Sequence, residues 1–150
     1  DKNGIALFEA WAQYDFSSNW SARLGRQVIS YDNQRIFGEI DWLQQGQSHD
    51  AALFSFHKEK HQLDLGFAMN ANAENLVAPK TPYTTNYKSL QYAWYHTQFS
   101  KINASVLLLN TAYEFEKSLG NFEVDYKQTF GSYLAFKDKK WDSNLGFLYP

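Results

Sequence analysis

The stretch EVDYKQTFGSYLAFK, residues 123–137, carries the clearest signal for the fold. Its large apolar side chains fall mostly on even positions, and polar or small side chains fill most of the odd positions. The even set is Val124, Tyr126, Phe130, Leu134 and Phe136, and the odd set includes Glu123, Asp125, Lys127, Thr129, Gly131 and Lys137. A two-residue period predicts a β-strand with one apolar and one polar face. A soluble sandwich buries the apolar face, whereas a transmembrane barrel turns it to lipid and keeps the polar face in the lumen.

Similar stretches recur along the whole chain. Each covers about ten residues or more, the length that a tilted strand needs to cross a bilayer, whereas strands of soluble proteins are nearer five or six residues. We therefore predict an all-β fold, an antiparallel meander of about eight long strands in a single domain over residues 1–150. The expected strands lie near residues 5–16, 20–30, 47–57, 62–71, 87–99, 102–115, 122–137 and 141–149.

The connections between these strands alternate between short and long. Four are short, at residues 17–19, 58–61, 100–101 and 138–140, whereas those at residues 31–46 and 72–86 are long and that at residues 116–121 is intermediate. Outer-membrane barrels have short periplasmic turns and longer extracellular loops. The alternation therefore predicts a transmembrane β-barrel, located in the bacterial outer membrane with membrane lipid or detergent as a partner.

The number of strands bears on whether this barrel is complete. If the short turns are periplasmic, both ends of the chain lie outside the cell, whereas complete bacterial barrels usually keep both termini in the periplasm. This parity favours an internal piece of a larger barrel. The alternative is a complete small barrel, since barrels of about eight strands exist.

The alternation also predicts which side chains face lipid and which face the lumen. One stretch, residues 106–109, is apolar on both faces, which indicates contact with a plug or a neighbouring loop if the pattern holds there. The outward set includes Phe54, Phe67, Leu90, Tyr92, Trp94, Leu134 and Phe147, and the inward set includes Asp64, Ser89, Gln91, Thr97 and Lys127.

Composition limits the classes of function. Aromatic residues make up 18 % of the chain, as expected where aromatic girdles lie at two membrane interfaces. The mean hydropathy is −0.54, and this value is compatible with a barrel because only alternate residues need be apolar. A net charge of −2 gives no basis for a nucleic-acid partner, and the absence of cysteine excludes disulfides and thiolate zinc sites.

No enzyme or cofactor motif appears in the sequence. A nucleophile elbow, a Walker loop and a glycine-rich dinucleotide turn are all missing. His49, Asp50, His57 and His61 lack the spacing of a metal-binding set. We therefore expect neither catalysis nor a bound metal or cofactor.

The densest polar segment begins at Arg23 and continues to Gln47. Arginine offers forked donors suited to carboxylates, and tryptophan can stack on the apolar face of a sugar. This segment could line a path for an acidic polysaccharide or a small anion. The alternative is structural, because luminal arginines can simply pair with neighbouring acids. The candidate path residues are Arg23, Arg26, Gln27, Arg35, Trp42 and Gln45.

Residues 23–50 resemble the alginate-export family of outer-membrane β-barrels. In that family a Gly-Arg-Gln strand end leads into a loop with an Arg and a Trp, followed by a Gln/Gly run and an Asp that opens the next strand. The matching positions are Arg23, Gly25, Arg26, Gln27, Asp32, Arg35, Gly38, Trp42, residues 44–47 and Asp50. The resemblance implies a barrel of about eighteen strands with an arginine-lined conduit for anionic polysaccharide such as alginate, and 150 residues cannot supply that many strands.

Two observations temper this interpretation. Family members tend to be basic in the strand after the loop, where this chain has Leu53 and Ser55, and its expected luminal set is mixed in charge. We therefore predict a porin-like channel segment, with two alternatives. One is a soluble β-barrel that binds a ligand inside, and the other is an outer-membrane adhesin whose loops carry the function.

Overall fold

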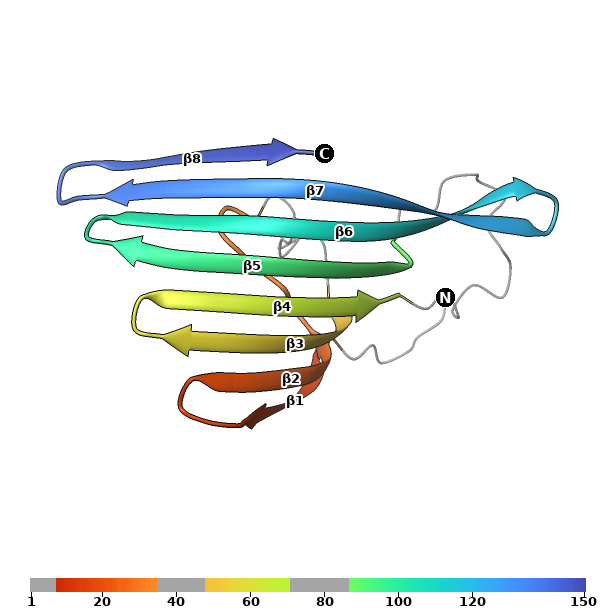
Figure 1. Cartoon of the computed structure of the whole chain (residues 1–150), viewed down its shortest axis with the longest axis horizontal. Helices are drawn as coiled ribbons and strands as arrows, with labels where there is room; N and C mark the ends of the chain where they lie inside the picture. Colours follow the sequence, from red (N-terminus) through yellow and green to blue (C-terminus); the bar gives the residue numbers. More distant parts are fainter. Residues whose placement is uncertain (1–7, 35–47, 71–86) are drawn as a thin grey trace, which may run out of the picture.

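The computed structural model describes residues 8–34, 48–70 and 87–150. These residues form one open, antiparallel sheet of eight strands in chain order, which confirms the predicted all-β meander (Figure 1). Within these ranges, no helix is long and apolar enough to cross a membrane. The strands are β1 Ala10–Asp15, β2 Trp20–Gln27, β3 His49–Lys58, β4 His61–Met69, β5 Ser89–Phe99, β6 Ile102–Ser118, β7 Asn121–Lys137 and β8 Asp142–Tyr149.

Each strand pairs with the next through a hairpin or a longer connection. The four short connections lie at one end of the sheet, as predicted, and two of them contain a residue with positive φ, Glu59 at 54° and Ser100 at 53°. The connection at residues 116–121 differs from expectation, because β6 and β7 continue until only a tight turn at Leu119 and Gly120 remains. Both strands are 17 residues long and form the longest hairpin of the sheet.

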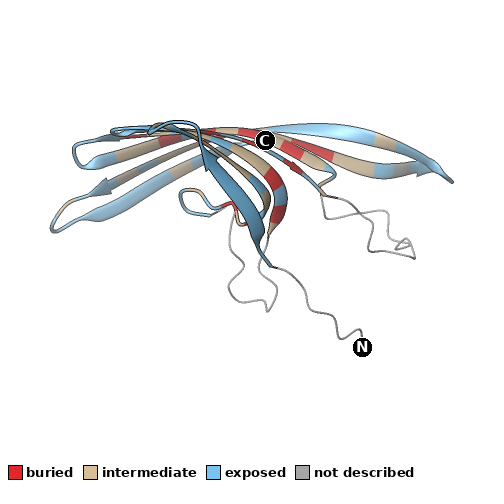
Figure 2. Cartoon of the chain, turned by 90° about the horizontal axis from the view of Figure 1, so that it is seen from below, coloured by how far each residue is buried: buried red, intermediate tan, exposed pale blue. Residues whose placement is uncertain are grey.

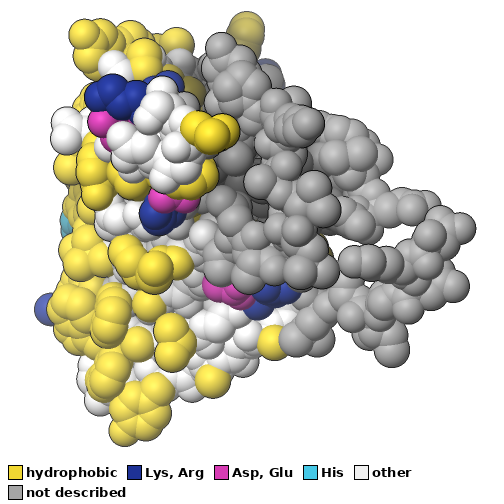
Figure 3. Space-filling view, turned by 90° about the vertical axis from the view of Figure 1, so that its right-hand side faces the viewer, with side chains coloured by type: hydrophobic (Ala, Val, Ile, Leu, Met, Phe, Trp, Pro, Cys, Tyr) yellow, Lys and Arg dark blue, Asp and Glu magenta, His cyan; other side chains and the backbone are white. Residues whose placement is uncertain are grey.

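The sheet is arched and has two different faces (Figure 2). Large hydrophobic side chains gather on the convex side, as the end-on view in Figure 3 shows. Phe54, Phe67, Leu134 and Phe147 on this side are all more than two-fifths exposed. The buried side chains form a thin core on the concave face. Its members are Ile29, Ala51, Ala68, Leu90, Tyr92, Trp94 and Leu107.

The pairing register tests the predicted facing of side chains. The prediction is confirmed for most strands, with Phe54, Phe67, Leu134 and Phe147 on the convex face and Asp64 and Lys127 on the concave face.

For β5 the prediction is wrong. Trp94 pairs with Asp64 and with Leu107, so Leu90, Tyr92 and Trp94 face the concave side, and Ser89, Gln91 and Thr97 face the convex side. The physical reason is that Tyr92 and Trp94 are buried against the chain segment that follows β2. A partner inside the arch therefore covers these rings on the concave side.

The same segment explains the stretch at residues 106–109. Leu107 is buried on the concave face in the core, with Leu109 packed against that core. Val106 and Leu108 are exposed on the convex face. Both faces of β6 are apolar here because one is covered by a neighbouring segment, as the sequence indicated.

Candidate functional site

The main feature of the concave face is a short segment, residues 28–34, which we call the inner arm. It leaves the end of β2 and lies beneath the arch (Figure 2). A turn closed by Gln34 N–H donating to the Tyr31 carbonyl, at 2.9 Å, shapes its tip. Asp32 and Gln34 adopt positive φ values of 52° and 60°. The arm therefore lies across the inner surface of the sheet and contacts strands that are distant in sequence.

Tyr31 is the first anchor of the arm. Its ring stacks on Trp94, with centroids 4.4 Å apart. Its hydroxyl donates to Asp64 Oδ2 at 2.9 Å and lies 3.1 Å from the hydroxyl of Tyr92. Burial, reinforced by Tyr92 and Asp64, raises the pKa of Tyr31 far above the ordinary tyrosine value. The phenol therefore stays protonated and remains a hydrogen-bond donor to the carboxylate.

Asp32 is the second anchor. Trp94 Nε1 donates to its Oδ2 at 2.9 Å, and Ser105 Oγ donates to its Oδ1 at 2.7 Å. Trp94 is therefore held on its face by Tyr31 and at its nitrogen by Asp32. Beyond Asp32, the arm lines a cavity of about 40 Å³ together with Leu107, Gly146 and other residues of β6–β8.

The sheet beneath Tyr31 is adapted to this arrangement. The Tyr92 ring lies over Gly66, where an added Cβ would be 2.1 Å from the ring atoms. Asp64 is 3 % exposed and also accepts from Gln62 Nε2 at 3.1 Å. Its second oxygen, Oδ1, has no hydrogen-bond partner among the described residues. Tyrosine, tryptophan and glutamine side chains therefore surround this acid.

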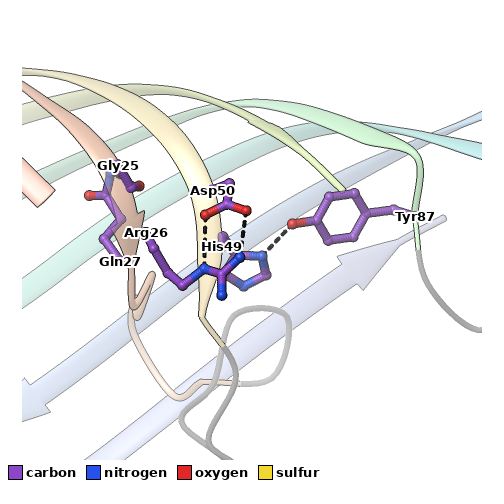
Figure 4. Close-up of polar contacts among 6 residues, drawn as sticks. All are labelled: Gly25, Arg26, Gln27, His49, Asp50 and Tyr87. Atoms are coloured by element: carbon purple, nitrogen blue, oxygen red, sulfur yellow. Dashed lines mark hydrogen bonds and ion pairs between the residues drawn. The ribbon is translucent and has the colours of Figure 1, made fainter. Parts of the chain in front are cut away.

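A second cluster of contacts joins the strand ends next to the two long connections (Figure 4). Gln27 at the end of β2 is buried and donates to the Ala51 carbonyl at 3.0 Å. His49 Nδ1 at the start of β3 lies 2.5 Å from the hydroxyl of Tyr87, and their rings are stacked. Burial raises the pKa of Tyr87 to about 12, so it too is a neutral phenol at physiological pH. These contacts fix the strand ends from which the inner arm departs.

Arg23 lies on the concave face, as predicted. Its guanidinium donates through Nε and Nη2 to Gln13 Oε1 at 3.1 and 2.8 Å and lies 4.1 Å from the centre of the Trp11 ring. Gln13 in turn donates to Asp15 at 2.9 Å. Arg23 is half-buried among neutral partners, which leaves its charge available to an anion on this surface.

Arg26 lies on the opposite, convex face. It pairs across the strands with Asp50 through two hydrogen bonds of 2.9 Å, one to each carboxylate oxygen (Figure 4). The parity of Arg26 with Leu24 requires this direction, and no bulge redirects the side chain between β2 and β3. Arg26 therefore does not line the concave surface.

The other predicted path residues divide into two groups. Gln27 points to the concave side, but it is only 1 % exposed. Its amide nitrogen donates hydrogen bonds to the carbonyls of Gly25 and Ala51, so it is not free to contact a solute. Arg35, Trp42 and Gln45 lie outside the described residues. The structure thus brings together Arg23, Gln13 and Trp11, and separates Arg26 from them.

Sequence reasoning missed Tyr92 and Trp94 as members of the site. The only signal for them was indirect, namely the stretch at residues 106–109 that is apolar on both faces. The histidines are dispersed, since His49 contacts Tyr87 and His61 contacts Tyr95. Across residues 8–34, 48–70 and 87–150, no group of three or more histidine or acidic side chains is placed to hold a metal ion.

Comparison with known proteins agrees with this geometry. The family model for alginate export matches residues 1–97, which include β1 to β4 and most of β5. The chain belongs to the alginate export family. No curated protein and no solved structure matches it.

Membership has two consequences for this alginate export chain. The family is one of transport proteins and not of enzymes, so a role in polysaccharide export is indicated. The matched region contains Arg23, the inner arm and the loop bases, whereas β6, β7 and β8 continue the same sheet beyond it.

Proposed function

We propose that this chain forms part of the wall of an outer-membrane channel through which an anionic polysaccharide such as alginate passes. The convex face would contact lipid, and the concave face would line the conduit. The observation that carries the proposal is the division of one sheet into a convex face with exposed large hydrophobic side chains and a concave face that bears Arg23 and the inner arm, within a chain of the alginate export family.

The direction of the faces argues against a soluble ligand-binding barrel. Such a barrel presents its apolar face to an interior ligand and its polar face to water. Here the large exposed hydrophobic side chains, among them Phe54, Leu134 and Phe147, lie on the outside of the arch. An exposed aromatic surface of this extent favours a lipid environment.

The inner arm bears on how an anionic polymer could pass. Two of the acids beneath the arch, Asp32 on the inner arm and Asp64 on β4, would repel such a polymer if they were free. Both accept hydrogen bonds from neutral donors within the arm network, and Asp64 is buried there. The docked arm therefore buries the carboxylate of Asp64, and the carboxylate of Asp32 accepts hydrogen bonds from Trp94 and Ser105. Arg23 remains as a cationic group on the neighbouring strands.

Single-channel recording tests the proposal. In the intact protein reconstituted in a planar bilayer, Arg23→Glu should reduce the preference for anions over cations, measured as the reversal potential under a salt gradient. The effect should weaken as salt rises, because the Debye length is about 10 Å at 0.1 M. Arg26→Glu is the matched control, since it makes the same charge change three residues away on the opposite face.

Each outcome is informative. A shift for Arg23→Glu that exceeds the shift for Arg26→Glu supports a conduit on the concave face. Equal shifts, or no shift in either variant, would contradict it and leave Arg23 as a structural partner of Gln13 and Trp11.

A further inference from the structure

The β6–β7 hairpin carries a surface that the conduit does not explain. We propose that its outer part projects beyond the hydrocarbon of the membrane, and that its convex residues Phe122, Val124 and Tyr126 dock on the sugar headgroups of an outer-leaflet glycolipid. We call these three residues the hairpin stripe. The proposal rests on the membrane location given above as the proposed function.

The first argument is length. A tilted strand needs about 9–11 residues to cross the bilayer, and β6 and β7 have 17 each. The excess lies at the end of the sheet where the two long connections begin (Figure 1). That end is extracellular if the short turns face the periplasm.

The second argument is a row of amides on the convex face, formed by Gln91, Asn110 and Gln128. These residues are adjacent in register, and Asn110 Nδ2 donates to Gln91 Oε1 at 2.6 Å. On β6, the stretch from this row to Ile102 is about 27 Å long, or about 20 Å in height at a tilt near 40°. This height is close to the apolar band of such barrels, which is about 25 Å tall.

Ion pairs lie at the same end of the sheet but beyond the amide row, because Glu114 is the cross-strand neighbour of Val124 and Asp50 is in register with Met69, which follows Phe67 toward that end. Arg26 pairs with Asp50 at 2.9 Å, and Lys88 pairs with Glu114. Charged pairs and amides are costly in hydrocarbon but stable at its polar border. The membrane boundary therefore lies at the amide row, and residues beyond it on β6 and β7 extend outside the hydrocarbon.

The hairpin stripe lies beyond this boundary and yet is apolar. Phe122 is 59 % exposed, Val124 39 % and Tyr126 61 %. The three share the parity of Phe130 and Leu134, so the stripe continues the proposed lipid-facing surface past the amide row. Such rings need a partner that is less apolar than lipid tails and less polar than water.

A sugar headgroup meets these requirements. Aromatic rings stack on the C–H faces of sugars, and a glycolipid beside the barrel places sugars directly above the hydrocarbon on the convex side. The transported polymer would run on the concave side, which the stripe does not face. A second copy of the chain is less suitable, because three side chains bury on the order of 300 Å², well below the roughly 800 Å² per partner of a stable interface.

Site-directed spin labelling tests the proposal, since the chain has no native cysteine. Three single variants are made in the intact protein: Val124→Cys in the stripe, Asp125→Cys at the same height on the concave face, and Leu134→Cys within the apolar band. Each is reconstituted in phosphatidylcholine vesicles alone, with lipid A, or with lipopolysaccharide that carries its core sugars. Accessibility of the label to oxygen and to a water-soluble nickel complex is then measured.

We expect the label at position 134 to be accessible to oxygen and protected from nickel in all vesicles. The label at 124 should be accessible to nickel in phosphatidylcholine, and lose that accessibility severalfold when core sugars are present but not with lipid A alone. The label at 125 should not respond. Replacing both rings, as Phe122→Ser with Tyr126→Ser, should restore nickel access at 124, whereas Tyr113→Ser with Phe115→Ser on the concave face should not.

Three results would overturn the proposal. One is a label at 124 that behaves like that at 134, because the hairpin would then lie in hydrocarbon. Another is a label at 124 whose accessibility to nickel does not change when core sugars are present. The third is dipolar broadening between labels at 124, which would assign the stripe to a second copy. Nickel access at 134 would instead refute the membrane location itself, so the two proposals fail separately.

Discussion

Strands β5 and β7 belong to the same sheet, but β5 buries two aromatic rings on the concave face, whereas β7 exposes large side chains on the convex face. On β5, Tyr92 and Trp94 face the concave side and are buried. On β7, Phe130 and Leu134 face the convex side and are exposed. The difference is that the inner arm packs beneath β5 through Tyr31. Aromatic rings of this sheet are therefore buried on the concave face where the inner arm packs against them.

The largest expected effect concerns the inward ring. Trp94→Ala removes a buried ring, its stacking on Tyr31 and the donor to Asp32. It should reduce the free energy of unfolding by about 3–5 kcal/mol, measured by denaturant unfolding in lipid vesicles. Trp141→Ala is the control, since that ring is 73 % exposed, and its cost should be much smaller. Similar costs for both variants would refute the contrast between inner and outer rings.

The outward face is tested next. Leu134→Arg should cost about 2–4 kcal/mol in lipid if the site lies near the bilayer midplane, measured by the same unfolding experiment. Thr129→Leu, on the concave face of the same strand, should have little effect. If Leu134→Arg were neutral and Thr129→Leu damaging, the faces of β7 would be reversed.

A smaller effect isolates the anchor of the arm. Tyr31→Phe keeps the ring on Trp94 but removes the hydroxyl that donates to Asp64 and lies beside Tyr92. Loss of a hydrogen bond to a carboxylate typically costs about 1–3 kcal/mol, and the unfolding free energy should fall by that amount. Tyr126→Phe on the exposed convex face is the matched control and should be close to neutral. Equal stability of the two variants would show that the Tyr31 hydroxyl contributes nothing to holding the arm.

The smallest effect is expected at the convex border. Arg26→Ala removes an ion pair with Asp50 in which both side chains are about half exposed. Exposed pairs contribute about 0.2–1 kcal/mol, and the loss should shrink further at high salt. Asp50→Asn should give a similar small change. A cost comparable to that of Tyr31→Phe would mean that this pair is far less solvated than its position indicates.

The comparison of β5 with β7 also shows what the sequence could predict. The alternation in β7 predicts both its strand type and its faces, and the structure places the apolar set on the convex face. In β5 the same rule fails, since Tyr92 and Trp94 are buried by a segment that is 61 or more residues distant in sequence. Only long-range packing determines that choice, and the pattern within β5 itself does not record it.

The candidate site was predictable to a similar extent. Parity placed Arg23 on the concave face, and parity also kept Arg26 off it. The neutral partners of Arg23, Gln13 and Trp11, lie across the strand pair, and their contact depends on the β1–β2 register. The roles of Tyr31 and Asp32 as anchors depend on the turn of the arm, whose positive φ values are not encoded by a glycine.

One further consequence concerns the width of the proposed conduit. The Tyr92 ring rests over Gly66, where even a methyl group would collide with it. A ring that lies along the sheet thickens the wall by little more than its own depth, whereas a ring standing upright would reach far into the interior. In the proposed conduit, Gly66 would therefore keep the interior wide, because it lets the bulky Tyr92 ring lie flat against the sheet.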